Sequence, residues 1–231
     1  DKLESLGLRE KTLVIFTGDN GTYVKIVSNL NGVNYPGGKG TTRDNGTHVP
    51  LVASWPGTAP AGKVSNALVD FSDILPTLVE TAGAELPAGE LYEGVSLVPL
   101  LRGKPFNGRE SIYCWYHRNG LRGKESQHSR NQDFKLYSTG RYFNVAGDLL
   151  EKKSIKISSL TGSGLAAYNA LKTALATQLE ATRKATEILK KRGFGGAAKK
   201  EGKNKNAKAK NVEKKQTRKK SKNEKREKKQ D

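Results

Sequence analysis

The sequence has no methionine and a single cysteine, Cys114, in 231 residues. One cysteine excludes a framework of disulfide bonds within the chain. The sequence also has no apolar run close to the roughly 20 residues that cross a bilayer, so we predict no transmembrane segment. The chain starts at Asp1 and soon reaches a strand-like apolar run. We therefore interpret it as part of a longer polypeptide, in which a missing targeting segment excludes no location.

Negative charge is scarce at the carboxyl end. Residues 190–231 carry +14 of the formal net charge of +18, and residues 1–189 carry only +4. Among residues 197–231 the only large apolar side chain is Val212, so this stretch cannot bury enough surface to offset the entropy of ordering. We predict a disordered Lys-rich tail over residues 194–231. Counterion release would let it contact polyanions through residues 197–231, whereas a solubilising or cell-surface tail is the alternative.

The first part of the chain has the pattern of a mixed α/β domain. Residues 12–17 form a short β-branched apolar run, which is typical of a strand buried in a parallel sheet. Residues 22–34 are expected to form a loop, and a second apolar run follows at residues 49–55. A helix is predicted over residues 71–83. This order of strand, loop, strand and helix predicts an α/β layer architecture for residues 1–110.

The predicted helix over residues 71–83 has signals at both of its ends. Asp70 or Ser72 can act as the N-cap, because their side-chain oxygens accept hydrogen bonds from the first backbone amides. Gly83 is suited to end the helix, because glycine adopts the left-handed conformation that often follows a last turn.

A second unit is expected over residues 111–193. Residues 112–116 and 134–145 are rich in aromatic side chains and predict strands, the second run being folded into an antiparallel hairpin around residues 138–140. Residues 165–190 predict a helix. The apolar side chains that would share one face of this helix are Tyr168, Leu171, Leu175 and Leu179. We therefore expect a small antiparallel sheet with one packed helix.

Two polar residues, Asp19 and Asn20, follow the first apolar run directly. In open α/β sheets ligands bind beyond the carboxyl ends of the strands, so these side chains are placed for chemistry. A carboxylate and a carboxamide oxygen suit a hard cation such as Ca²⁺, whereas zinc more often takes His or Cys. The alternative is a strand-end turn in which both side chains bond to the backbone.

Two further candidates are basic. Lys39 lies within the glycine-rich residues 37–40, where the backbone can approach an anion closely while the ammonium neutralises it. The spacing does not fit a Walker A loop, and a solvated turn lysine is the alternative. His48 begins the second apolar run and is either a structural histidine or a catalytic one. We expect Arg43 and Asp44 to be surface partners rather than reacting groups.

Taken in order, these motifs resemble the C-terminal part of the sulfatase family, particularly the bacterial arylsulfatase-A-like enzymes. The resemblance is nearly continuous over residues 12–103 and continues more loosely to the helix near residue 189. The motifs that carry it are G-D-N-G, G-G-K-G-T-T, G-x-H-V-P, W-P-G, D-x-x-x-I-L-P-T-L-x-x-x-A-G and Y-E-G-V-S-L-x-P-L-L-x-G. It implies the end of an alkaline-phosphatase-like α/β/α sandwich, followed by the small antiparallel sheet with its packed helix. The disordered basic tail over residues 194–231 has no counterpart in that family and is predicted from composition alone.

The resemblance implies roles for individual residues. Asp19 and Asn20 match the family's Asp-Asn pair that holds Ca²⁺, and Lys39 matches the lysine that contacts the sulfate group. The family often has Arg where this chain has His48, so we expect His48 to support the anion site. The nucleophile, a formylglycine made from Cys or Ser in a C-x-P-S-R-like motif, would lie upstream. The surroundings of Cys114 do not match that motif, so we expect this chain alone to be inactive.

Other functions remain open at this point. A phosphate-ester hydrolase of the same superfamily would generally hold two zinc ions with Asp-His pairs, and Asn20 argues instead for one hard cation and for sulfate. An inactive homologue whose tail binds polyanions is a further alternative. The family resemblance implies an aryl or carbohydrate sulfate as substrate, and export to the periplasm or the cell exterior.

Overall fold

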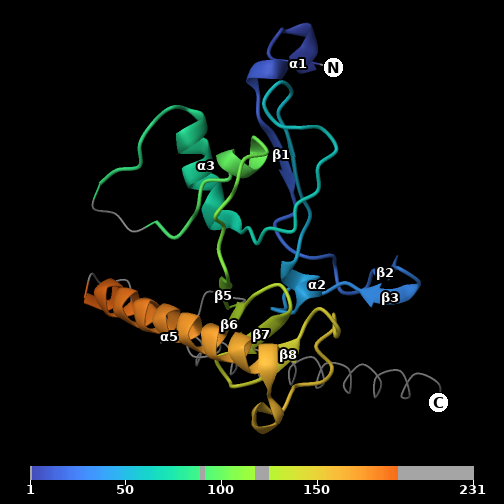
Figure 1. Ribbon diagram of the computed structural model, residues 1–231, viewed down its shortest axis with the longest axis vertical. Helices are drawn as coiled ribbons and strands as arrows, with labels where there is room; N and C mark the ends of the chain where they lie inside the picture. Colours follow the sequence, from blue (N-terminus) through green and yellow to red (C-terminus); the bar gives the residue numbers. More distant parts are fainter. Residues whose placement is uncertain (1, 89–91, 118–124, 192–231) are drawn as a thin grey trace, which may run out of the picture. The chain divides into compact units, whose positions relative to one another are not determined.

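The computed structural model of the chain describes residues 2–88, 92–117 and 125–191 (Figure 1). The predicted tail over residues 194–231, with its polyanion contact, lies outside these ranges. The chain divides into two compact units, Asp1–Leu179 and Glu180–Asp231. The boundary predicted near residue 110 stays a prediction.

The described strands and helices follow in chain order. The strands are β1 Val14–Thr17, β2 Val27–Leu30, β3 Val33–Pro36, β4 Leu51–Ser54, β5 Ile112–Tyr116, β6 Ser126–Arg130, β7 Phe134–Tyr137 and β8 Tyr142–Asn144. The α-helices are α1 Lys2–Ser5, α2 Asp44–Thr47, α3 Ile74–Thr81, α4 Val98–Leu101 and α5 Gly162–Lys191, and the 3-10 turns are η1 Arg9–Lys11, η2 Phe71–Asp73 and η3 Ile157–Ser159. None of the helices in the described ranges is long and apolar enough to cross a membrane.

Strand β1 pairs with β4 in an antiparallel sheet, in a register that places Val14 opposite Ser54. The prediction of a parallel sheet around residues 12–17 is therefore wrong for the strands that the structure describes. Strands β1 and β4 also carry exposed apolar side chains: Phe16 is 66% exposed and Val52 is 57% exposed. An apolar run identifies a strand, but it does not determine the direction of the neighbouring strand.

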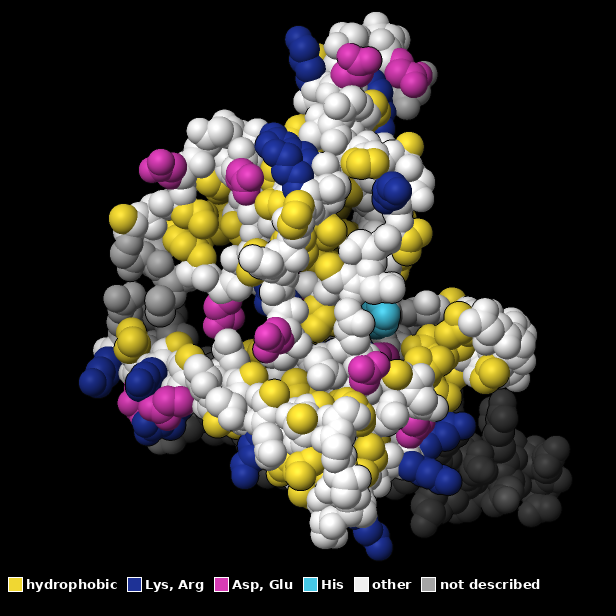
Figure 2. Space-filling model, viewed as in Figure 1, with side chains coloured by type: hydrophobic (Ala, Val, Ile, Leu, Met, Phe, Trp, Pro, Cys, Tyr) yellow, Lys and Arg dark blue, Asp and Glu magenta, His cyan; other side chains and the backbone are white. Residues whose placement is uncertain are grey.

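The segment expected to be a loop contains a hairpin, made by the antiparallel pair β2 and β3. Its turn is formed by Asn31 and Gly32, with φ of 51° and 83°. Positive φ at both positions is what a tight hairpin turn needs, and Asn-Gly is the usual pair there. The Asn29 carboxamide accepts a hydrogen bond from the Gly32 amide at 2.8 Å. Figure 2 shows hydrophobic side chains gathered over this hairpin, and Val33 is 63% exposed.

The helix predicted over residues 71–83 is confirmed, as η2 followed by α3. Asp70 and Asp73 form a capping box: the Ser72 amide donates to Asp70 at 2.7 Å, and the Asp70 amide donates to Asp73 at 2.8 Å. Gly83 follows the helix with φ of 66°, as expected for a glycine stop. The guanidinium of Arg109 forms ion pairs with both aspartates, which fixes the start of the helix.

The antiparallel sheet with a packed helix, predicted after residue 110, is confirmed. That residues 111–193 form a unit of their own stays a prediction. The sheet has the antiparallel order β5-β6-β7-β8. Strand β6 is polar and was not predicted from the sequence. Leu136 and Tyr142 of the sheet pack against Leu171 and Leu175 of α5 in a shared core. Figure 1 shows this part of α5 running beside the sheet. The opposite face of β7 carries Lys135 and Tyr137, because successive side chains of a strand point to opposite faces.

Candidate functional site

Three backbone segments cross closely at the end of β1. The Gly21 amide donates to the Gly46 carbonyl at 2.9 Å, which joins the strand end to α2. The Lys39 amide donates to the Thr22 carbonyl at 3.0 Å, which joins the glycine-rich loop to the same strand end. We call the segments 21–23, 37–41 and 45–46 the glycine crossing.

The glycine crossing leaves no room for side chains at its glycines. A Cβ atom at Gly21 would lie 2.0 Å from the Asn45 carbonyl oxygen, and one at Gly37 would lie 2.1 Å from the Tyr23 carbonyl oxygen. At Gly38 it would lie 2.3 Å from Asn45 Oδ1. Glycine is therefore required at these positions to let the segments approach, as distinct from the turn glycines, which are required for their positive φ.

The glycine crossing brings the four candidate residues into one loop cluster. Asp19 and Asn20 directly precede Gly21, Lys39 is bonded through its own amide, and His48 lies two residues after Gly46. Asp19, Lys39 and His48 are exposed, and Asn20 is half-buried. Within the part of the chain that the structure describes, no group of three or more His, Cys, Asp or Glu side chains is placed to hold a metal ion.

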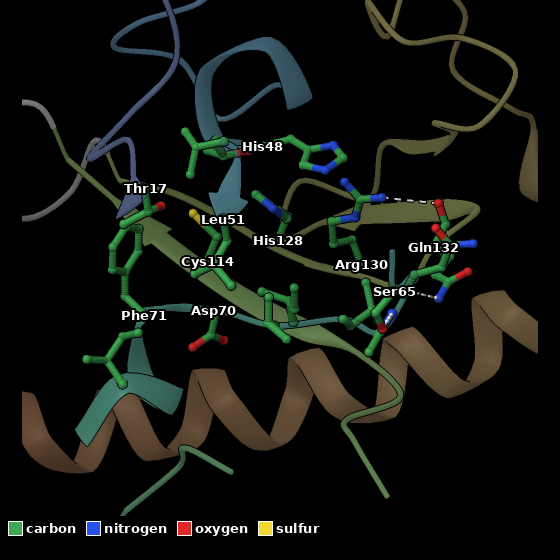
Figure 3. Close-up of a pocket in the computed structure, with 18 residues that line it drawn as sticks. Thr17, His48, Leu51, Ser65, Asp70, Phe71, Cys114, His128, Arg130 and Gln132 are labelled. Atoms are coloured by element: carbon green, nitrogen blue, oxygen red, sulfur yellow. Dashed lines mark hydrogen bonds between the residues drawn. The ribbon is translucent and has the colours of Figure 1, made fainter. Parts of the chain in front are cut away.

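A cavity of about 390 Å³ lies beside this cluster, and His48 is the one candidate that lines it (Figure 3). Cys114 and His128, which are opposite each other on β5 and β6, face it together with Arg130. Its apolar wall includes Leu51.

Burial shifts the pKa of two residues that line this cavity, His128 and Cys114. Burial lowers the pKa of His128 well below its ordinary value, and the charges of Lys135 and Arg130 lower it further. His128 is therefore neutral at neutral pH, and its Nδ1 atom has no hydrogen-bond partner within the described residues. Burial raises the pKa of the Cys114 thiol, which keeps it protonated and weakly nucleophilic.

Asp44 is buried, at 3% exposure, so the expectation that it is a surface partner is wrong. Its Oδ1 accepts a hydrogen bond from Lys135 Nζ at 2.8 Å, and its Oδ2 accepts one from Arg130 Nη1 at 2.6 Å. Arg43, by contrast, is exposed as expected. The charge of Asp44 is compensated by two cations from the C-terminal sheet.

Lys135 is completely buried, at 0% exposure, in the same cluster. Its ammonium also donates to Glu151 Oε1 at 2.8 Å and to the Thr42 carbonyl at 2.9 Å. The Tyr137 hydroxyl donates to Glu151 Oε2 at 2.6 Å, and burial and this carboxylate raise the pKa of Tyr137. Only a weak signal in the sequence indicates this cluster: Lys135 lies between the apolar Phe134 and Leu136 in a predicted strand.

The sequence of this chain is similar to those of known sulfatases. The family model described as "Sulfatase" matches residues 1–84. Human arylsulfatase A is 44% identical to this chain over 112 residues, which cover 48% of this chain and 22% of that protein. Human arylsulfatase D is 33% identical over 154 residues, which cover 63% of this chain and 26% of that protein. The chain thus spans about a quarter of the length of these curated relatives.

The fold of this chain is also similar to that of solved structures. The structure of BT4656 in complex with its substrate D-glucosamine-2-N,6-O-disulfate is similar to this chain with a TM-score of 0.56 and 25% sequence identity. The match covers 86% of this chain and 38% of that chain. The predicted fold class, an alkaline-phosphatase-like α/β fold with a small antiparallel sheet and packed helix, is confirmed.

Proposed function

Residues 1–84 of this chain belong to the sulfatase family, and from that premise we propose that the chain supplies part of the active site of an enzyme that hydrolyses sulfate esters. One observation carries the proposal: the glycine crossing joins the strand end that bears Asp19 and Asn20 to the loop that bears Lys39. Oxygen donors for a hard cation and an ammonium group in one loop cluster suit an anionic substrate. The substrate class is an aryl or carbohydrate sulfate.

Asp19 and Asn20 fit part of a Ca²⁺ site. Both offer side-chain oxygens at the exposed end of β1, and Ca²⁺ takes about six to eight oxygen ligands. The remaining ligands belong to polypeptide outside this chain. When bound, the ion supplies positive charge that neutralises the sulfate oxygens.

Lys39 is proposed as the sulfate contact of this chain. Its backbone is fixed by the bond to Thr22, while its side chain is exposed, so the ammonium can reach an anion from a defined starting point. There it stabilises the charge that develops as the S–O bond breaks. His48, which follows α2 in the same cluster, supports the anion site.

The nucleophile is a formylglycine in the polypeptide that precedes this chain. Cys114 is not its precursor, because it lies within β5 and the residues that follow it do not match a C-x-P-S-R-like motif. These 231 residues alone are therefore inactive. Measurable sulfate-ester hydrolysis by the isolated chain would contradict this part of the proposal.

The experiment replaces Lys39 in the native-length polypeptide, by which we mean this chain together with the preceding part that carries the proposed nucleophile. Lys39→Met lowers kcat/KM for an aryl sulfate by about 100-fold or more, because one preorganised charge at the developing anion is lost. Lys25→Met, which removes another exposed lysine from the preceding segment, leaves kcat/KM unchanged and is the matched control. Removal of Ca²⁺ by a chelator lowers activity, and added Ca²⁺ restores it. Equal activity of the Lys39 and Lys25 variants would refute the role of Lys39.

Two further parts of the proposal concern the protein's surroundings. Residues 197–231 contact polyanions through their dense positive charge, and the enzyme is exported to the periplasm or the cell exterior. Retention on a sulfated matrix should weaken with added salt and disappear when residues 197–231 are deleted. Retention that survives the deletion contradicts the first statement, and recovery of the native polypeptide only from the cytoplasmic fraction contradicts the second.

A further inference from the structure

The buried cluster of Lys135, Asp44 and Glu151 has no part in the active site proposed above. We infer that Lys135 is a positioning residue, which fixes the loop of residues 39–48 and thereby directs Lys39 toward the sulfate group of the substrate. The inference rests on the proposed function, because that proposal makes Lys39 the sulfate contact.

The bonds of Lys135 are divided between the loop and the C-terminal sheet region. An ammonium has three hydrogens to donate, and each has an acceptor here. Thr42 O at 2.9 Å and Asp44 Oδ1 at 2.8 Å belong to the loop, and Glu151 Oε1 at 2.8 Å follows the sheet. The fully buried ammonium therefore holds the loop at two points.

The neighbours of Lys135 hold the same two loop residues. Arg130 donates to Asp44 at 2.6 Å. The Tyr137 hydroxyl, whose single hydrogen is shared with Glu151, also lies 3.2 Å from the Thr42 carbonyl oxygen. The hydroxyls of Thr42 and Ser126 are 2.8 Å apart and share a hydrogen bond. All three partners lie on β6 or β7, whose sheet is backed by α5 on its other face, so the loop is tied to a packed core.

The loop transmits this position to the candidate residues. The His48 amide donates to the Asp44 carbonyl at 2.8 Å, so His48 is placed by the anchored end of α2. On the other side, the amide and the hydroxyl of Thr41 both donate to the Gly38 carbonyl, at 2.9 and 2.8 Å. This compact turn contains Lys39. A shift at residues 42–44 therefore moves both candidates.

The chemistry of the cluster suits a positioning role better than a purely stabilising one. The buried Lys135 and the half-buried Arg130 balance the charges of two buried carboxylates, Asp44 and Glu151. Replacing such groups by apolar ones of similar size is often neutral for stability. Glu151 also adopts φ of 53°, a left-handed conformation that is uncommon for a residue other than glycine. Strained backbone of this kind tends to occur where geometry serves function.

The test uses a charge-balanced variant of the native-length polypeptide. Lys135→Met combined with Glu151→Gln removes one cation and one anion, which leaves Asp44 paired with Arg130 and keeps the fold. We expect kcat for an aryl sulfate to fall by at least about tenfold with little change in KM, because a misplaced charge affects the transition state most. We also expect amide hydrogen exchange in residues 37–46 to rise by about tenfold, with no change in β1.

The matched control is Arg109→Met, which removes the cation of the ion pairs at the start of α3 and touches no residue of the loop. It should leave kcat and the exchange of residues 37–46 unchanged. Equal loss of kcat in both variants, or unchanged loop exchange in the double variant, overturns the inference. If the wild type hydrolyses no sulfate ester, the proposed function fails, and the exchange measurement alone decides whether Lys135 fixes the loop.

Discussion

Gly38→Ala is the substitution that tests the glycine crossing most severely. Gly38 is buried, and an added Cβ would lie 2.3 Å from Asn45 Oδ1 and 2.6 Å from the Asn45 carbonyl carbon. Because one of these atoms belongs to the backbone, rotation of a side chain cannot relieve the clash. The glycine-rich loop must therefore move away from α2, the short helix that precedes His48.

The magnitude follows from that movement. Overpacking of this kind costs about 1–3 kcal/mol of unfolding free energy, against a gain of about 0.4–1 kcal/mol from a stiffer unfolded chain. A displacement of about 1 Å at a substrate contact can reduce the rate by about 100-fold. We therefore expect Gly38→Ala to lower activity far more than it lowers stability.

The assay compares Gly38→Ala with Gly147→Ala in the native-length polypeptide. A Cβ at Gly147 would meet only Asn144 atoms at 3.6–3.7 Å, which is ordinary contact, so this control should change the unfolding free energy by less than about 0.5 kcal/mol. Urea unfolding and kcat/KM for an aryl sulfate are measured on both variants. If Gly38→Ala is as stable and as active as the control, the close approach at the crossing is not what the site requires.

Two further predictions concern stability. His128 has a pKa lowered by burial and by Lys135 and Arg130, so its neutral form is favoured on folding. The stabilisation is complete above the unfolded pKa near 6.5 and is lost by up to about 1.4 kcal/mol per pH unit as the pH falls below it. When the unfolding free energy is measured against pH, it should fall less steeply below about pH 6.5 in His128→Gln than in the wild type. Identical slopes would contradict the assignment. Leu171→Ala should lower the unfolding free energy by about 2–5 kcal/mol, because Leu171 is 1% exposed. Leu165→Ala should lower it much less in the same experiment, because Leu165 is 40% exposed. Equal losses would contradict the packing of α5.

Local signals predicted the elements that local interactions determine. The helix after Asp70 was predicted because its cap and its glycine stop are both within a few residues of it, and the structure has both. The hairpin around Asn31 and Gly32 carries an equally local signal, an Asn-Gly turn, but residues 22–34 were predicted to be a loop. Apolar and polar residues do not alternate regularly along its two strands, so the strand signal there is weak.

Contacts distant in sequence account for what was not predicted. Lys135 and Asp44 are 91 residues apart and bond only because the C-terminal sheet lies against the loop, so no spacing in the sequence could show the pair. Strand β1 was expected in a parallel sheet, but an apolar run carries no information on strand direction. The resemblance to a family identified Asp19, Asn20 and Lys39 as candidates, and their roles stay predictions.

The measurement that tests the central claim most directly is hydrolysis of a matched pair of esters, an aryl sulfate and the corresponding aryl phosphate, by the native-length polypeptide. If the protein is a sulfatase, kcat/KM is higher for the aryl sulfate than for the aryl phosphate, and the Lys39→Met variant loses the activity on the sulfate. A higher kcat/KM for the phosphate, or no turnover of any aryl or carbohydrate sulfate by a folded native-length protein, would contradict it.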